Sequence, residues 1–182
     1  MRGQLYALFL AGATLSAVGN SPAHGADNDA LIKSAMSAAP ESVAKDATIV
    51  TFDDKMQMVT LRKGTNEFTC MPDNPDTPGN DPECDDKAGF EFAMAWMSHK
   101  PPEMKTVGFG YMLQGGSDAS NSDPFAKEPK DGKWLTTGPH VMLFNPGALA
   151  LNYPRQAENP NTSAPYVMWP GTPYEHLMIP VK

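Results

Sequence analysis

Histidine and methionine recur with the same spacing in two segments near the end of the chain, "HVM" (140–142) and "HLM" (176–178). Both segments lie in strand-like runs, where residues two apart point to the same face. If the two strands pair, two imidazoles and two thioethers converge, a donor set that suits Cu(I) and, less well, Cu(II). The candidate ligands are His140, Met142, His176 and Met178. Methionine also fills cores, and a strand histidine is often simply buried and hydrogen-bonded to backbone.

The segment "GGSDASNSDPF" (115–125) could instead supply a hydrolase with its nucleophile. Such an enzyme needs a nucleophile, a base and an orienting acid. The candidate catalytic residues are His140, His176, Ser117 and Asp118. No G-x-S-x-G elbow is present, and loops of this composition are usually turns made by side chain to backbone hydrogen bonds.

The same loop is the first choice for binding a small polar ligand, because long loops in compact domains are often functional. The segment "PYVMWPGTPYEHLMIPV" (165–181) is the most apolar part of the chain after residue 26. Its aromatic side chains could line a pocket or a partner surface, or belong to the core. The candidate ligand-binding residues are Ser120, Asn121, Asp123, Tyr166 and Trp169.

Cys70 and Cys84 are the two cysteines of the chain. They enclose a proline-rich loop, and in an exported chain we expect them to form a disulfide. A crosslink closing a loop of this length stabilises by roughly 3 kcal/mol on the chain-entropy model. Zinc is disfavoured because no C-x-x-C spacing is present.

Acidic residues in and after this loop also raise the question of calcium, which prefers carboxylate oxygens. They are Asp73, Asp76, Asp81, Glu83, Asp85 and Asp86. The D-x-[DN]-x-[DN]-G spacing of an EF-hand is missing, and prolines constrain the backbone. Turn and helix-cap roles are therefore favoured over calcium binding.

Residues 1–26 have the layout of a secretory signal peptide that is removed from the mature protein. Arg2 precedes an apolar run over 5–18, and small residues follow at 20–26. The apolar run is too short to span a bilayer comfortably. We expect a periplasmic or secreted protein with no membrane span after cleavage.

The formal net charge of −7 disfavours nucleic-acid partners, since a basic patch is their usual footprint. The remaining expected partners are a small ligand or another protein of the cell envelope. The 18 prolines and 15 glycines predict many loops around a modest scaffold.

Hydrophobic periodicity predicts a single α+β domain over residues 27–182, with a mainly antiparallel sheet. The helices are expected within 27–40 and 86–100, with a helical turn between residues 145 and 163. The strands are expected at 48–52, 56–64, 65–71, 106–114, 139–144, 164–169 and 174–181. The first three strands are expected to form a meander, and the two glycines of the fourth indicate a bulge or a close backbone approach.

The segments "SNSDPFA", "GPHVM" and "PYVMWPGTPYEHLMIPV" resemble parts of an uncharacterised family of bacterial exported proteins. The resemblance covers most of residues 60–182. It implies export and a single domain, and it implies no activity or ligand.

Together these observations favour an exported ligand-binding or accessory envelope protein. A small hydrolase using a loop serine with His140 or His176, and a copper-binding protein using the H-x-M strands, are the alternatives.

Overall fold

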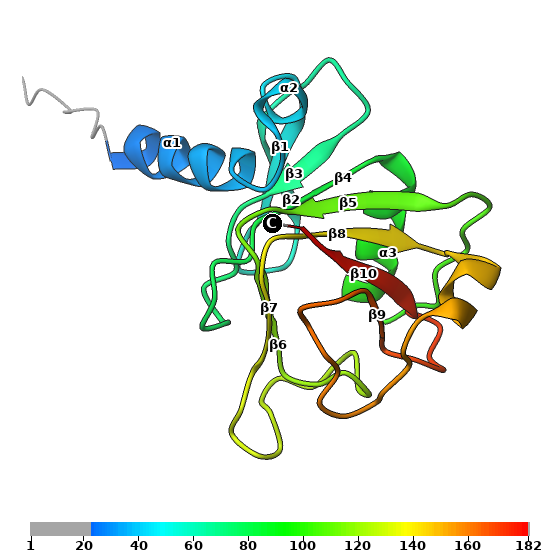
Figure 1. The fold of residues 1–182 in the computed structure, drawn as a ribbon. Helices are drawn as coiled ribbons and strands as arrows, with labels where there is room; N and C mark the ends of the chain where they lie inside the picture. Colours follow the sequence, from blue (N-terminus) through cyan, green and yellow to red (C-terminus); the bar gives the residue numbers. More distant parts are fainter. Residues whose placement is uncertain (1–22, 182) are drawn as a thin grey trace, which may run out of the picture.

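Eight strands form one mainly antiparallel sheet within residues 23–181, which are the residues that the computed structural model describes (Figure 1). The strand order is β2-β1-β3-β4-β5-β8-β10-β9. The strands are β1 (Thr48–Phe52), β2 (Met58–Arg62), β3 (Thr69–Met71), β4 (Glu83–Asp85), β5 (Gly108–Met112), β8 (His140–Phe144), β9 (Tyr166–Met168) and β10 (His176–Pro180). The predicted single α+β domain is thereby confirmed.

Helices cover both faces of this sheet. They are α1 (Ala23–Met36), α2 (Glu41–Ala44), α3 (Lys87–Met97) and the 3-10 helix η1 (Gly147–Asn152). Figure 1 shows α1 and α2 near β1 and β3, whereas α3 lies against β5 and β8. Side chains along β4 alternate between the two faces of the sheet. Cys84 faces α1 and α2 and packs with alanines there, whereas Glu83 and Asp85 point to the face covered by α3. No described helix is long and apolar enough to cross a bilayer.

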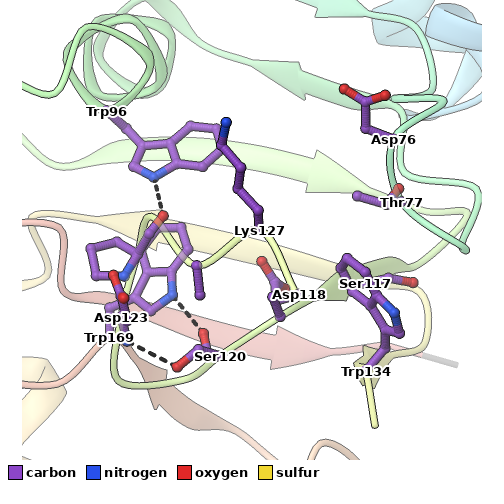
Figure 2. Close-up of a pocket in the computed structure, with 13 residues that line it drawn as sticks. Asp76, Thr77, Trp96, Ser117, Asp118, Ser120, Asp123, Lys127, Trp134 and Trp169 are labelled. Atoms are coloured by element: carbon purple, nitrogen blue, oxygen red, sulfur yellow. Dashed lines mark hydrogen bonds between the residues drawn. The ribbon is translucent and has the colours of Figure 1, made fainter. Parts of the chain in front are cut away.

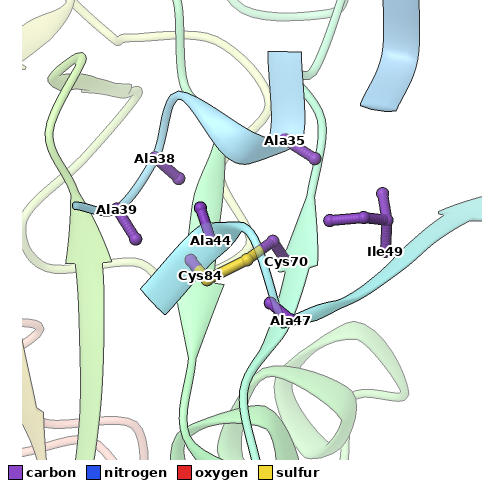
Figure 3. Packing of buried hydrophobic residues seen from close by; sticks show 8 residues of the cluster. All are labelled: Ala35, Ala38, Ala39, Ala44, Ala47, Ile49, Cys70 and Cys84. Atoms are coloured by element: carbon purple, nitrogen blue, oxygen red, sulfur yellow. A yellow bond between two sulfur atoms is a disulfide. The ribbon is translucent and has the colours of Figure 1, made fainter. Parts of the chain in front are cut away.

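The predicted disulfide is confirmed, and it lies inside the α1–α2 side of the sheet. Cys70 and Cys84 are direct cross-strand partners on β3 and β4 and are bonded to each other. Both are fully buried, and small side chains surround them (Figure 3). The surrounding residues are Ala35, Ala38, Ala39, Ala44, Ala47 and Ile49. Small side chains let the helical layer approach the crosslink closely.

Two sequence predictions of the topology were wrong. The strand expected at 65–71 is not the third strand of a meander, since β3 pairs with β1 and runs parallel to it. The segment 115–125, expected to be a loop, begins as a strand: β6 (Gly116–Asp118) pairs with β7 (Leu135–Thr137) in a separate two-stranded sheet. Strands this short carry little periodicity to recognise.

The predicted signal peptide, residues 1–26, lies outside the described residues except for its last four, which begin α1.

Helix α3 begins at a well-formed cap and sits directly on β5. The Asp86 carboxylate accepts a hydrogen bond from the backbone N–H of Gly89 at 2.7 Å, the usual N-cap arrangement. A Cβ placed on Gly108 of β5 would lie 2.5 Å from the Gly89 nitrogen. Of the two glycines predicted to mark a bulge or a close backbone approach, Gly108 marks such an approach, because any larger side chain there would push α3 off the sheet.

Substituting Gly108 by alanine is expected to lower the free energy of unfolding by about 1–3 kcal/mol, because the new methyl group has no space against backbone atoms. Gly138→Ala is the matched control, since a Cβ there meets no atom within 4 Å. Urea unfolding of both variants measures the difference. Equal stability of the two variants would contradict the packing described here.

Replacing Cys70 and Cys84 together by alanine is expected to cost about 2–4 kcal/mol of unfolding free energy, mainly because the unfolded chain is no longer constrained. The exposed Met58→Ala variant controls for an unrelated truncation. A double variant that unfolds at the same urea concentration as the parent would show that the crosslink does not stabilise this fold.

Candidate functional site: a tryptophan pocket above a thioether cavity

All three tryptophans of the chain line one pocket of about 320 Å³, here called the tryptophan pocket. Figure 2 shows Trp96 and Trp169 on one side, Trp134 on the opposite side, and Asp118 between them. The polar side chains of its wall are Asp76, Thr77, Ser117, Asp118, Ser120, Asp123 and Lys127. Five of these seven come from β6 and from the chain that connects it to β7. The pocket thus combines flat apolar surfaces with hydroxyl and carboxyl groups.

Two indoles are fixed in place by the loop that they contact. Trp96 of α3 and Trp169, which follows β9, are stacked with ring centroids 5.8 Å apart. The Trp96 Nε1–H donates to the Pro124 carbonyl at 2.8 Å, and the Trp169 Nε1–H donates to the Ser120 carbonyl at 2.9 Å. Because both bonds end on the β6–β7 connection, the tryptophans and the loop position one another.

Trp169 also adopts an unusual backbone conformation, with a φ of 49°. A bulky residue in the left-handed region is strained and persists only where its surroundings impose it. Here the buried Asn121 imposes it: its amide group donates to the carbonyls of Gln156 and Val167, and its Oδ1 accepts the Trp169 N–H at 3.4 Å. Strain of this kind often marks a functional position.

Asp118 is the carboxyl group best suited to proton transfer in the tryptophan pocket. Burial raises the pKa of Asp118 to about 7, and repulsion from Asp81 and Glu83 adds to the shift. Burial also raises the pKa of Glu83 to about 7. Burial and the adjacent Glu83 hold the pKa of Asp85 well above its usual range. A carboxyl that titrates near neutrality can both donate and accept a proton.

A second, smaller space of about 100 Å³ lies behind the tryptophan pocket and shares Trp96, Asp118 and Trp169 with it. We call it the thioether cavity, because four methionines line it together with His176 and Glu83. The methionines are Met112, Met142, Met168 and Met178. Phe92 and Phe144 complete its apolar wall.

The H-x-M strands are neighbours, and their register places the candidate copper ligands. β8 and β10 pair antiparallel, with Met142 directly opposite Met178. His140 is opposite Pro180, and His176 is opposite Phe144, so the two histidines lie at opposite ends of the β8–β10 pair. Four residue positions separate them along the strands, which corresponds to about 13 Å at the usual rise per residue. The methionines therefore meet, whereas the two histidines belong to different rows of the sheet.

Both histidines are buried and neutral at pH 7. Burial lowers the pKa of His176 to about 4 and also lowers the pKa of His140. The Nδ1 atom of His140 is 2.7 Å from the Gly138 carbonyl, and that of His176 is 2.9 Å from the Tyr174 carbonyl. Since a carbonyl only accepts, each Nδ1 carries the proton and each Nε2 carries a lone pair. Across residues 23–181, neither imidazole is hydrogen-bonded to a serine or a carboxylate, so the expected serine–histidine relay is not formed.

The other predicted residues divide into pocket and framework positions. Ser117, Ser120 and Asp123 line the tryptophan pocket. Asn121 holds Trp169 as described, and Tyr166 is fully buried, with its hydroxyl 2.8 Å from Thr137 Oγ1. Neither of these last two side chains lines the pocket.

The acids considered for calcium have separate structural tasks. Asp86 caps α3, Asp73 accepts the Asp81 N–H at 2.6 Å, and Asp85 lies in the interior with both carboxyl oxygens unpaired among the described residues. No three His, Cys, Asp or Glu side chains in this part of the chain are arranged to hold a metal ion. Methionine is outside that set of donors.

Sequence reasoning missed several site residues. Trp96, Trp134 and Met112 are absent from the predicted site residues, and Met168 is absent from the predicted copper ligands. Glu83 was treated as a turn acid, although its alternation with Cys84 gave a signal: once Cys84 faces the core layer beneath α1, Glu83 must face the other side.

Comparisons of the chain with protein-family models, curated proteins and solved structures find no match. The resemblance to a bacterial exported family therefore stays a prediction.

The raised carboxyl pKa values predict that stability falls as the pH rises from about 4 through about 7, and the last part of this fall, above pH 6.5, is the part that histidine titration opposes least. The folded protein keeps protons on Glu83 and Asp118 up to about pH 7, whereas the unfolded chain releases them near its ordinary values of about 4. Raising the pH through 7 therefore favours the unfolded chain. His140 and His176 act in the opposite direction, but only below about pH 6.5, where the unfolded chain protonates them.

The variant Glu83→Gln removes one of these protons, so its thermal midpoint should fall less than that of the parent between pH 6.5 and 8. The exposed Glu91→Gln, on α3, is the control. Thermal unfolding at pH 6.5 and pH 8 gives the change in midpoint for each protein. A parent midpoint that does not change between these two pH values would contradict the raised pKa of Glu83 and Asp118.

Proposed function

We propose that this chain is an exported ligand-binding protein whose tryptophan pocket holds a small saccharide. The observation that carries the proposal is the convergence of all three tryptophans of the chain on one pocket with a wall of hydroxyl and carboxyl groups. A sugar ring presents apolar C–H faces, which pack on indole surfaces, and hydroxyls, which bond to carboxylates and serines. Concave sites with these two components are typical of small-molecule binding.

The charge of the pocket favours a neutral ligand over an anionic one. Its wall carries the carboxyls of Asp76, Asp118 and Asp123 and a single ammonium group, that of Lys127. A phosphate or carboxylate ligand would be repelled, since a nearby like charge is unfavourable in a partly buried site. A neutral polyhydroxylated ring meets no such penalty and can use every carboxylate as a hydrogen-bond acceptor.

Export is supported by the predicted signal peptide and by the disulfide, since structural disulfides persist mainly in oxidising compartments. A periplasmic or secreted location would bring the pocket into contact with saccharides of the envelope or the surroundings.

Intrinsic fluorescence tests the proposal directly because every tryptophan of the chain lies at the pocket. Titration with a panel of mono- and oligosaccharides is expected to change the emission in a saturable way, and an open-chain polyol should not reproduce it. Trp134→Ala should weaken binding about tenfold, corresponding to about 1.4 kcal/mol, whereas Trp134→Phe should keep most of the affinity.

Leu151→Ala serves as a surface control, because Leu151 is exposed and does not line the pocket. If no saccharide changes the emission, or if Trp134→Ala binds as the parent does, the proposal is wrong.

A further inference from the structure

Four donor side chains occupy adjacent positions on the α3-facing side of the sheet. Met142 lies directly opposite Met178 on β8 and β10, and His176 lies directly opposite Met168 on β10 and β9. His176 and Met178 are two apart on one strand and therefore share that face. We call the four the thioether–imidazole quartet: Met142, Met168, His176 and Met178. All four line the thioether cavity.

The quartet side chains are buried, and all of them border the thioether cavity. Each of its residues is at most 4% exposed. Gly110 pairs with Met142 from β5, and a Cβ at Gly110 would lie 3.0 Å from the Met142 methyl carbon. The rings of Phe92 and Trp169 pack on the His176 ring, with centroids 5.5 and 5.2 Å away. The four donor side chains are therefore largely removed from solvent and line one small cavity.

The lone pairs of the quartet are available. The Nδ1–H of His176 donates to the Tyr174 carbonyl, which leaves the lone pair on Nε2. The hydrogen bond that the His176 ring makes is the one from its Nδ1 atom. A backbone carbonyl that fixes the tautomer in this way is the usual outer support of a metal-binding histidine. The Met168 sulfur is 3.7 Å from the Tyr166 hydroxyl, a weak contact that leaves its second lone pair free.

We propose that the thioether–imidazole quartet binds one Cu(I) ion. Three thioethers and one imidazole are soft to borderline donors, which Cu(I) prefers and which calcium and magnesium avoid. Zinc sites use thiolate, imidazole and carboxylate rather than thioether, so zinc is a poorer fit. Glu83 lines the same cavity and can balance the single positive charge.

This set differs from the one expected from the H-x-M spacing alone. In the proposed ligand set, Met168 takes the place of His140. The strand register pairs His140 with Met112 of β5, at the end of β8 away from His176. The Nε2 atom of His140 is buried and has no partner among residues 23–181. The Cu(I) proposal does not depend on saccharide binding, because none of the four donors lines the tryptophan pocket.

The test is anaerobic loading with Cu(I) kept reduced by ascorbate, which leaves disulfides intact, followed by competition with bicinchoninate. We expect one tightly held Cu(I) per chain. Replacing Met142 and Met178 together by leucine keeps the volume of the core and removes two sulfurs. Cu(I) affinity should then fall by about 10- to 100-fold or more, the range seen even for groups that only support metal ligands.

The matched control is Met56→Leu with Met58→Leu, since these methionines are exposed and outside the cavity. X-ray absorption of the loaded parent, which needs no variant to fold, should show sulfur around copper. Loss of all copper to bicinchoninate, equal retention by both double variants, or a copper shell without sulfur would each overturn the proposal.

Discussion

The direct contact of α3 with β5 determines how the rest of this face is built. Gly89 and Gly108 bring the helix backbone onto the strand with no side chain between them. Phe92 and Trp96, one and two turns further along α3, consequently reach over β8 and towards Trp169. A helix held further from the sheet could not close the thioether cavity or stack Trp96 on Trp169. The depth of the candidate site is therefore a consequence of two glycines.

This close packing also explains the unusual electrostatics of the interior. Asp85, His140 and His176 are removed from water beneath the helix and the β6–β7 hairpin. Burial disfavours charge, so it raises the pKa of the Asp85 carboxyl and lowers the pKa of both imidazoles. Neutral side chains can be buried at lower cost than ions, but an unpaired polar group still destabilises the fold. Among the described residues, the Asp85 carboxyl and the Nε2 atom of His140 are buried without partners, which is uncommon in a folded core.

Local sequence signals predicted those parts of the structure that depend on local chemistry. Cys70 and Cys84 are predicted to pair because they are the only cysteines, and the predicted helix-cap role of the loop acids is met by Asp86. The loop over 115–125 does contribute to a pocket. The parallel pairing of β1 with β3 was not predictable, since it joins segments separated by a whole hairpin.

Which residues line the site was harder to predict than which segments of the chain contribute to it. Trp134 precedes the three-residue strand β7, whose first residue, Leu135, pairs with Asp118, 17 residues earlier. Only the folded β6–β7 hairpin therefore shows that Trp134 lies across the pocket from Trp96 (Figure 2). Met168 joins His176 through the register of β9 with β10, which the spacing of residues along the chain does not determine. Alternation along a strand predicts which face of the sheet a side chain lies on. Which residue lies beside it on the next strand depends on how the strands pair, and the local sequence does not determine that.

The most direct test of a ligand site at the tryptophans is ¹⁹F NMR of protein labelled with 5-fluorotryptophan. The chain has three tryptophans, so the spectrum should contain three assignable resonances. The account predicts that one saccharide moves all three resonances along a single saturable titration, because all three indoles face the same ligand. A saccharide panel that leaves them unmoved, or a ligand that binds without moving them, would contradict it.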